Sequence, residues 1–207
     1  MARLNREQIA ASALSVIDEK GLAGFTIRSV ADALGVSPMA IYYHVKDKAE
    51  LAGLVVSAAI REVAPAPPTG VWRDDMLEIA RWSRDYVTRH PAVGELHRVY
   101  PVITPEIVKT AERWVNLWQH SGLDRKTAKR AAHVSSIAIA SLVVHVAKFL
   151  QVGSPSRRPA SSKSRAAFLS HDIEDLYELA FASIIDGLHA NLGKQRRKVR
   201  QRRIHNT

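Results

Sequence analysis

Apolar residues recur at every third or fourth position along almost the whole chain, which is the period of a helix with one buried face. Near the N-terminus this spacing predicts a helix over residues 5–20, and Gly21 is well suited to end it. No segment alternates apolar and polar residues convincingly, as a half-buried strand does. We therefore expect an all-α fold.

Residues 26–48 predict two short helices separated by a turn of three residues, 35–37. Thr26 is a suitable N-cap for the first helix, and Ser37 followed by Pro38 suits the start of the second. This arrangement is a helix-turn-helix, a motif whose second helix lies in the major groove of DNA. The N-terminal part of the chain is therefore predicted to bind DNA.

The second short helix leaves several side chains for a DNA groove, because only Ile41 and Val45 are spaced to face the core. Tyrosine hydroxyls and histidine nitrogens can bond phosphates, and small apolar side chains can contact thymine methyl groups. The candidates of these kinds are Met39, Ala40, Tyr42, Tyr43 and His44. Two alternatives remain open, namely an ordinary three-helix bundle and a Tyr43 that packs on the neighbouring helix.

A fourth helix is predicted to begin at a capping box formed by Asp47 and Glu50 in the pattern D-x-x-E. Lys46 and Lys48 flank its start, where their ammonium groups can reach phosphates.

Residues 4–60 resemble the DNA-binding domain of TetR-type transcriptional repressors, through T-x-R-x-V-A-x-x-L-G-V-S followed by Y-Y-H-V-K-D-K-x-x-L. The resemblance implies that bases are read by Arg28 and by the start of the second short helix, Ser37, Pro38, Met39 and Ala40. It also implies that phosphates are held by Thr26, Tyr42, His44 and Lys48. The base-reading end has few hydrogen-bonding side chains, so a tet-type operator is not expected.

Proline and glycine between residues 64 and 70 predict a break between two domains. We expect a DNA-binding domain over 4–62, a helical ligand-binding and dimerisation domain over 71–193, and a basic, disordered tail over 194–207. Within the second domain, helices are predicted over 72–90, 93–99, 105–122 and 171–193, with a low-complexity loop at 153–166. A further long helix is predicted to begin at Asp124 or Thr127 and to run to residue 151.

The long helix predicted up to residue 151 is rich in small residues, which allow another helix to approach closely. With the final helix it could form a four-helix interface between two copies of the chain, where the family resemblance also places it. A two-fold dimer would set the two reading helices about 34–36 Å apart, on successive major grooves. The alternative is that both helix faces are used within one subunit.

An apolar cleft with a few polar groups is the usual kind of small-molecule site. Aromatic and histidine side chains of the second domain suggest such a site for a largely apolar effector. The candidates are Trp82, Tyr86, His97, Tyr100, Trp114, Trp118, His133 and Ile137. The alternative for each is core packing. No acidic cluster completes an oxygen-rich metal site around His97, so we expect no metal and no cofactor.

The formal net charge of +10 is concentrated at the C-terminus. Residues 1–64 hold seven basic and seven acidic side chains, whereas residues 194–207 hold seven basic side chains and no acidic one. A basic tail can add sequence-independent affinity for phosphates, or it can serve only as a solvated segment.

The absence of cysteine excludes a disulfide scaffold, and the N-terminus lacks an apolar signal core. The longest uncharged run, 131–147, is too short and polar for a membrane span, so a cytoplasmic protein with no membrane partner is expected. The sequence contains neither a phosphate-binding glycine loop nor a nucleophile elbow, so we do not expect an enzyme.

The sequence favours a ligand-responsive repressor that binds a palindromic operator as a homodimer and is released by a small-molecule effector. The alternative is a non-specific or architectural DNA-binding protein that depends on the basic tail.

Overall fold

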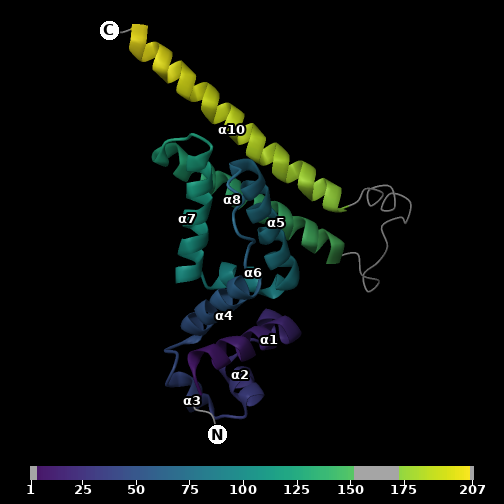
Figure 1. The fold of residues 1–207 in the computed structure, drawn as a ribbon. Coiled ribbons are helices and arrows are strands. Elements are labelled where there is room, and N and C mark those ends of the chain that lie inside the picture. Colours follow the sequence, from purple (N-terminus) through teal and green to yellow (C-terminus); the bar gives the residue numbers. More distant parts are fainter. Residues whose placement is uncertain (1–3, 152–172, 206–207) are drawn as a thin grey trace, which may run out of the picture. The chain divides into compact units, whose positions relative to one another are not determined.

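Every regular element in the described part of the chain, residues 4–151 and 173–205 of a computed structural model, is a helix (Figure 1). The all-α prediction is confirmed, and the loop predicted at 153–166 lies outside the described residues. The helices are α1 (Arg6–Gly24), α2 (Ile27–Leu34), α3 (Pro38–Tyr42), α4 (Lys48–Glu62), α5 (Trp72–Arg89), α6 (Pro91–Val99), α7 (Pro105–His120), α8 (Arg125–Gln151) and α10 (Ile173–His205).

Local capping signals set the bounds of the first helices. Asn5 caps α1 through the backbone N–H of Gln8, at 2.9 Å. Gly21 has a positive φ of 64° but an extended ψ of −174°, so it kinks α1 instead of forming the expected left-handed cap, and the helix continues to Gly24. The Thr26 hydroxyl accepts from the Ser29 N–H at 2.9 Å and so begins α2 where the sequence predicts.

Contacts between Cα atoms divide the chain into two compact units. Unit 1 comprises the described residues of 1–64 and 84–110, and unit 2 those of 65–83 and 111–207. The division differs from the domains expected from sequence, because α6 buries Val93 and Leu96 in the same apolar cluster as α1 and α4. The first six residues of α7 likewise belong to unit 1.

The core of unit 1 is formed by side chains that have no solvent exposure. They come from α1, the α1–α2 connection, α2, α3, α4 and α6, and include Ile9, Ile17, Phe25, Val30, Ile41, Leu51, Val55 and Leu96. Because α3 contributes only Ile41 to this cluster, one side chain anchors the whole short helix.

In unit 2, α8 and α10 pack along each other. Ile139 and Val143 of α8 and Phe181 and Ile185 of α10 are fully buried. Two bidentate ion pairs tie α10 to α5. The guanidinium of Arg73 lies 2.6 and 2.9 Å from the Asp186 carboxylate, and that of Arg81 lies 2.7 Å from both Glu178 oxygens.

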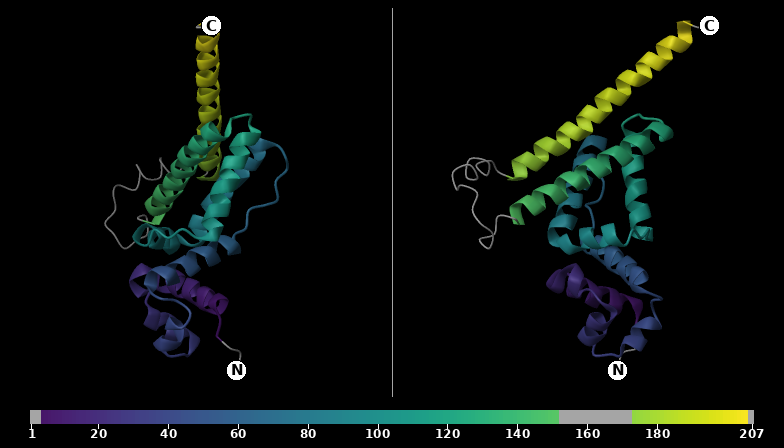
Figure 2. Two further views of the ribbon diagram at one scale, coloured as in Figure 1. Left: turned by 90° about the vertical axis from the view of Figure 1, so that its left-hand side faces the viewer. Right: turned by 180° about the vertical axis from the view of Figure 1, so that it is seen from behind.

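The prediction that Gly193 ends the last helix is wrong. Figure 2 shows α10 as one continuous helix, and its backbone remains helical to His205, through most of the tail expected to be disordered. A glycine in a helix interior costs only about 1 kcal/mol, and Lys, Arg and Gln, which follow it here, are good helix formers. None of the helices in the described residues is long and apolar enough to cross a membrane.

Candidate functional site

The α2–turn–α3 segment forms the predicted helix-turn-helix. Gly35 adopts the left-handed conformation, with φ 65°, and its N–H reaches back to the carbonyls of Ala31 and Asp32. Ser37 then caps α3 by accepting from the Ala40 N–H at 3.3 Å, with Pro38 in the first turn. The turn therefore redirects the chain with its backbone groups paired.

Side chains of α3 and the following turn divide sharply between the core and the surface. Ile41 and Val45 are 0% and 1% exposed, which confirms that they face the core. Met39, Tyr42 and Tyr43 are 63%, 48% and 84% exposed. The alternative in which Tyr43 packs on a neighbouring helix is therefore wrong. An exposed surface of hydroxyl and thioether groups is suited to contact phosphates and base edges.

All eleven candidate DNA-binding residues reach the surface. Eight are exposed, namely Thr26, Arg28, Ser37, Pro38, Met39, Tyr42, Tyr43 and Lys46. Three are partly buried, namely Ala40, His44 and Lys48. Nine of them lie in α3 or directly beside it, within residues 37–48, whereas Thr26 and Arg28 lie at the start of α2. Their assignment to DNA stays a prediction.

Lys48 makes a contact that sequence reasoning missed. Its ammonium lies 5.5 Å from the centroid of the Phe25 ring and 5.7 Å from that of Tyr100. Such cation–π contacts contribute about 0.5–1 kcal/mol at accessible sites, so they hold the lysine without removing its charge. Tyr100, a candidate ligand contact, thus lies beside a candidate phosphate contact.

The capping box predicted at the start of α4 is only half formed. Asp47 accepts from the Glu50 N–H at 2.8 Å, as expected. Glu50, however, accepts from the N–H of Lys46 rather than that of Asp47, at 2.8 Å, and pairs with Arg6 at 2.7 Å. The hydrogen bonds from Lys46 and Arg6 hold the pKa of Glu50 below its usual range. No local sequence signal marks Arg6, because its partners lie about forty positions away.

The opposite end of α4 is held by the first turn of α7. Glu106 accepts from the Ser57 hydroxyl at 2.6 Å and from the Arg61 guanidinium at 2.5 Å. Burial alone would raise the pKa of Glu106, but these hydrogen bonds and the charge of Arg61 outweigh it and leave the pKa lowered. α4 is therefore fixed near both of its ends by ionic hydrogen bonds.

The eight candidate ligand-binding residues occupy unlike environments. Trp82, Trp114 and Trp118 are buried, and the Trp118 indole N–H donates to the Ser135 hydroxyl at 3.0 Å. Burial raises the pKa of Tyr86. His97 and His133 are exposed, and Ile137 is 52% exposed. The tryptophans are core residues of unit 2, while the assignment of the set to a ligand stays a prediction.

The surface hollows of the described residues include one in each unit. One, of about 600 Å³ in unit 1, lies between α1 and α4 and is lined in part by Asp18, Glu62 and His90, whose Nδ1 lies 2.8 Å from the Asp18 carboxylate. The other, of about 580 Å³ in unit 2, is an apolar groove along α8 and α10 lined by Ala138, Ser141, Leu142, His145, Ala180, Ser183 and Ile184. None of the eight candidate ligand residues lines either hollow.

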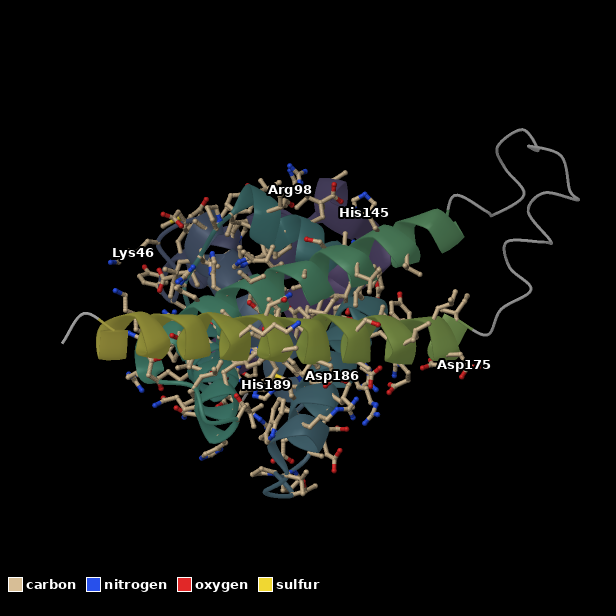
Figure 3. All side chains as sticks on the ribbon, turned by 90° about the horizontal axis from the view of Figure 1, so that it is seen from above. Lys46, Arg98, His145, Asp175, Asp186 and His189 are labelled. Carbon is tan, nitrogen blue, oxygen red and sulfur yellow. The ribbon has the colours of Figure 1, made fainter. Side chains whose placement is uncertain are left out.

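Three aromatic rings, those of Trp72, Trp118 and His189, lie close together near the C-terminal end of α7. The His189 ring of α10 is 4.7 Å from the Trp72 ring and 6.5 Å from the Trp118 ring, centroid to centroid. Figure 3 shows His189 and Asp186 on the same side of α10, where Asp186 meets Arg73. α5, α7 and α10 thus meet at one aromatic contact in unit 2.

Curated transcriptional repressors align with large parts of the chain. The repressor DrrR1 of Streptomyces coeruleorubidus is 29% identical over 122 residues, 58% of this chain and 45% of that protein. The class E tetracycline repressor of Escherichia coli is 31% identical over 100 residues, 47% of each chain. The chain thus spans about half the length of these two relatives.

Solved structures share the fold over most of the chain. ActR of Streptomyces coelicolor without ligand has a TM-score of 0.74 at 25% identity, covering 94% of this chain and 99% of that chain. BioQ of Mycobacterium smegmatis has a TM-score of 0.74 at 23% identity, covering 90% and 98%. Structures of ActR with actinorhodin and of BioQ with its natural double-stranded DNA operator have TM-scores of 0.72 and 0.71.

Two family models match successive parts of the chain and together take in more than half of it. The model for bacterial regulatory proteins of the tetR family matches residues 9–55, which include α2, the turn and α3. The model for the tetracyclin repressor-like C-terminal domain matches residues 64–144. The chain therefore belongs to the TetR family of bacterial transcriptional regulators.

Proposed function

We propose that this protein is a homodimeric repressor that binds a palindromic operator and is released by a small-molecule effector. The observation that carries the proposal is the exposed face of α3, which is anchored by the fully buried Ile41 and begins at a paired turn. Side chains fixed in this way can enter a major groove without losing much conformational freedom.

Within this proposal, the candidate residues have separate roles in DNA binding. Thr26, Tyr42, His44, Lys46 and Lys48 contact phosphates, which position the protein without reading sequence. Arg28 and the start of α3, from Ser37 to Ala40, contact base edges. Since Met39 and Ala40 offer only apolar surface, we expect thymine methyl groups to contribute strongly to the preferred sequence.

The apolar groove along α8 and α10 supports dimerisation. Apart from His145, its lining consists of small and aliphatic residues. Exposed apolar side chains flank it on both helices, Val134, Ile137, Leu176 and Leu179. A two-fold copy packed there would cover both helices and form a four-helix interface. The two α3 helices of such a dimer could then meet successive major grooves.

Release by an effector needs a contact that carries a change to α4. Glu106, at the start of α7, bonds both Ser57 and Arg61 of α4. An effector that shifts the first turn of α7 would move α4. The start of α4 would then shift residues 43–47, which connect it to α3. The solved structure of ActR with actinorhodin supports a small-molecule effector. Its proposed contacts in this chain are the buried tryptophans of unit 2.

The test is a binding assay with the duplex that lies upstream of this protein's own coding region. Competitor-resistant binding with a stoichiometry of two chains per duplex is the expected result. If binding disappears with excess unrelated DNA, a preferred sequence is sought by selection from random duplexes. Failure of that selection as well would contradict the proposed repressor.

The alternative, non-specific binding by the basic end of α10, is separated by a matched full-length variant. Replacing Arg196, Arg197 and Arg200 with Gln removes three charges and keeps good helix formers. A sequence-specific repressor retains its preference for the operator in this variant. A tail-driven binder loses affinity for all duplexes equally, and its salt slope falls by about three.

A further inference from the structure

We propose that Arg6 and Glu50 form a clamp that positions the α3–α4 corner, residues 43–47, for DNA binding. Arg6 is then a positioning residue, acting through protein groups, and Glu50 is its necessary partner. The inference rests on the proposed function, because it concerns the surface on which α3 meets DNA.

Arg6 begins α1 and uses both arms of its guanidinium on the corner. One arm, Nη1, donates to the carbonyl oxygen of His44 at 2.5 Å. The other, Nη2, pairs with Glu50 Oε1 at 2.7 Å. A planar guanidinium fixes the angle between its two bonds, so Arg6 sets the position of the corner relative to α1.

Glu50 completes the clamp from the first turn of α4. Its second oxygen, Oε2, accepts from the backbone N–H of Lys46 at 2.8 Å, while its own N–H donates to the Asp47 side chain at 2.8 Å. Arg6 and Glu50 therefore hold a carbonyl and an amide that lie two residues apart in the corner.

The short length of α3 makes this clamp consequential. α3 spans five residues, Pro38–Tyr42, and one-turn helices are not stable in isolation. Its C-terminal side continues into the corner through bonds from the His44 and Val45 amides to the Ile41 carbonyl, at 2.9 and 3.1 Å. The orientation of the exposed tyrosines therefore depends on where the corner is held.

A direct phosphate contact by Arg6 is the competing explanation, since its side chain is 49% exposed. The two explanations predict opposite signs for Glu50. Removing an acidic side chain near DNA raises affinity if only charge matters. Removing it lowers operator affinity if the clamp positions the corner.

The experiment measures dissociation constants for the operator and for an unrelated duplex, by fluorescence anisotropy between about 50 and 200 mM salt. The variants are Arg6→Ala, Glu50→Ala and the double substitution. The matched control is Arg98→Ala and Glu95→Ala, which remove an exposed ion pair of 3.8 Å from α6 in the same unit.

Each single clamp variant is expected to bind the operator about tenfold more weakly, as when the competent conformation falls to about a tenth of the population. The double variant should be no more than about twofold weaker than either single one, because both remove the same clamp. Affinity for the unrelated duplex and the salt slope should stay within experimental error, and the control pair should bind like the unchanged protein.

Stronger operator binding by Glu50→Ala would overturn the proposal. So would a salt slope lowered by about one in Arg6→Ala alone, which is the result expected for a lost phosphate contact. Arg6→Lys sharpens the distinction, because lysine keeps the positive charge but lacks the planar guanidinium that donates to two partners at once. The clamp predicts weakened operator binding for this variant, and a phosphate contact predicts nearly unchanged binding.

Amide hydrogen exchange at Lys46 in the free protein tests the clamp without DNA. Faster exchange at this amide in Arg6→Ala, with unchanged exchange in the core of α1, is expected. Unchanged exchange at Lys46 would refute the clamp. Failure of the unaltered protein to select any operator would instead refute the proposed function.

Discussion

Asp75 is a buried carboxylate in the first turn of α5, and its replacement by asparagine tests how the chain between α4 and α5 is held. The side chain is 3% exposed. One oxygen accepts from the backbone N–H and the hydroxyl of Thr69, at 2.6 and 2.8 Å, and the other accepts from the Gly70 N–H at 3.1 Å. Three donors thus converge on one carboxylate.

Asp75→Asn is expected to lower the free energy of unfolding by about 2 kcal/mol at neutral pH. The amide oxygen can still accept from Thr69, but the amide nitrogen meets the Gly70 N–H as donor against donor. A buried donor left unpaired costs about 1–3 kcal/mol, and neutral acceptors form weaker bonds than charged ones. Because Thr69 and Gly70 are exposed, water can replace part of the loss, which favours the middle of this range.

The pH dependence has a definite sign. Burial alone would raise the pKa of Asp75, but the bonds from Thr69 and Gly70, with the charge of Arg113, outweigh it and leave the pKa lowered. A lowered pKa in the folded state stabilises the protein above the unfolded pKa of about 3.9, and this contribution is lost as the pH falls through the folded value. The difference in the free energy of unfolding between the unaltered protein and Asp75→Asn should therefore shrink below a pH of about 4.

Urea denaturation followed by circular dichroism, at neutral pH and at several acidic values, measures both effects. Asp74→Asn is the matched control, because Asp74 is exposed in the same helical turn. The reasoning is refuted if Asp75→Asn and the control differ by less than about 0.5 kcal/mol at neutral pH, the usual range for surface substitutions. A difference that grows on acidification would refute the assigned pKa direction.

Three further substitutions probe α4, α3 and the core of unit 2. Glu106→Ala should lower stability by about 1–2 kcal/mol in urea denaturation, mostly through the lost Ser57 bond, since the Arg61 side chain is 52% exposed. Tyr43→Ala should leave stability within about 0.5 kcal/mol but weaken operator binding measured by anisotropy; unchanged affinity would remove Tyr43 from the DNA surface. Ser135→Ala should lower the urea midpoint by leaving the buried Trp118 N–H unpaired, a loss of about 1–3 kcal/mol, and an unchanged midpoint would contradict this.

The helix-turn-helix could be predicted because its signals are local. Thr26, Gly35 and Ser37 each act on backbone groups within three or four positions, so their residue types alone indicate where α2 and α3 begin and end. The burial of Ile41 and Val45 follows in the same way from a spacing of four. Sequence reasoning is strong where the partner of a side chain is its own neighbouring turn.

Contacts between distant segments could not be predicted by the same means. Glu50 fits a local capping box, yet the structure gives its carboxylate to Arg6 and Lys46. Gly193 fits a helix end, but helix propensity on both sides outweighs one glycine. His97 and His133 are both exposed, which their spacing along a helix could not show, and their assignment to a ligand stays a prediction.

The four tryptophans of the chain, Trp72, Trp82, Trp114 and Trp118, all belong to unit 2, and the helix-turn-helix contains none. Intrinsic emission excited at the red edge of the indole band therefore reports on one unit alone. The close approach of the Trp72 and Trp118 rings, 6.1 Å apart and both near the His189 imidazole, makes that emission sensitive to small rearrangements. Effector titrations can thus be followed without labels in the presence of operator DNA, with the two binding events separated optically.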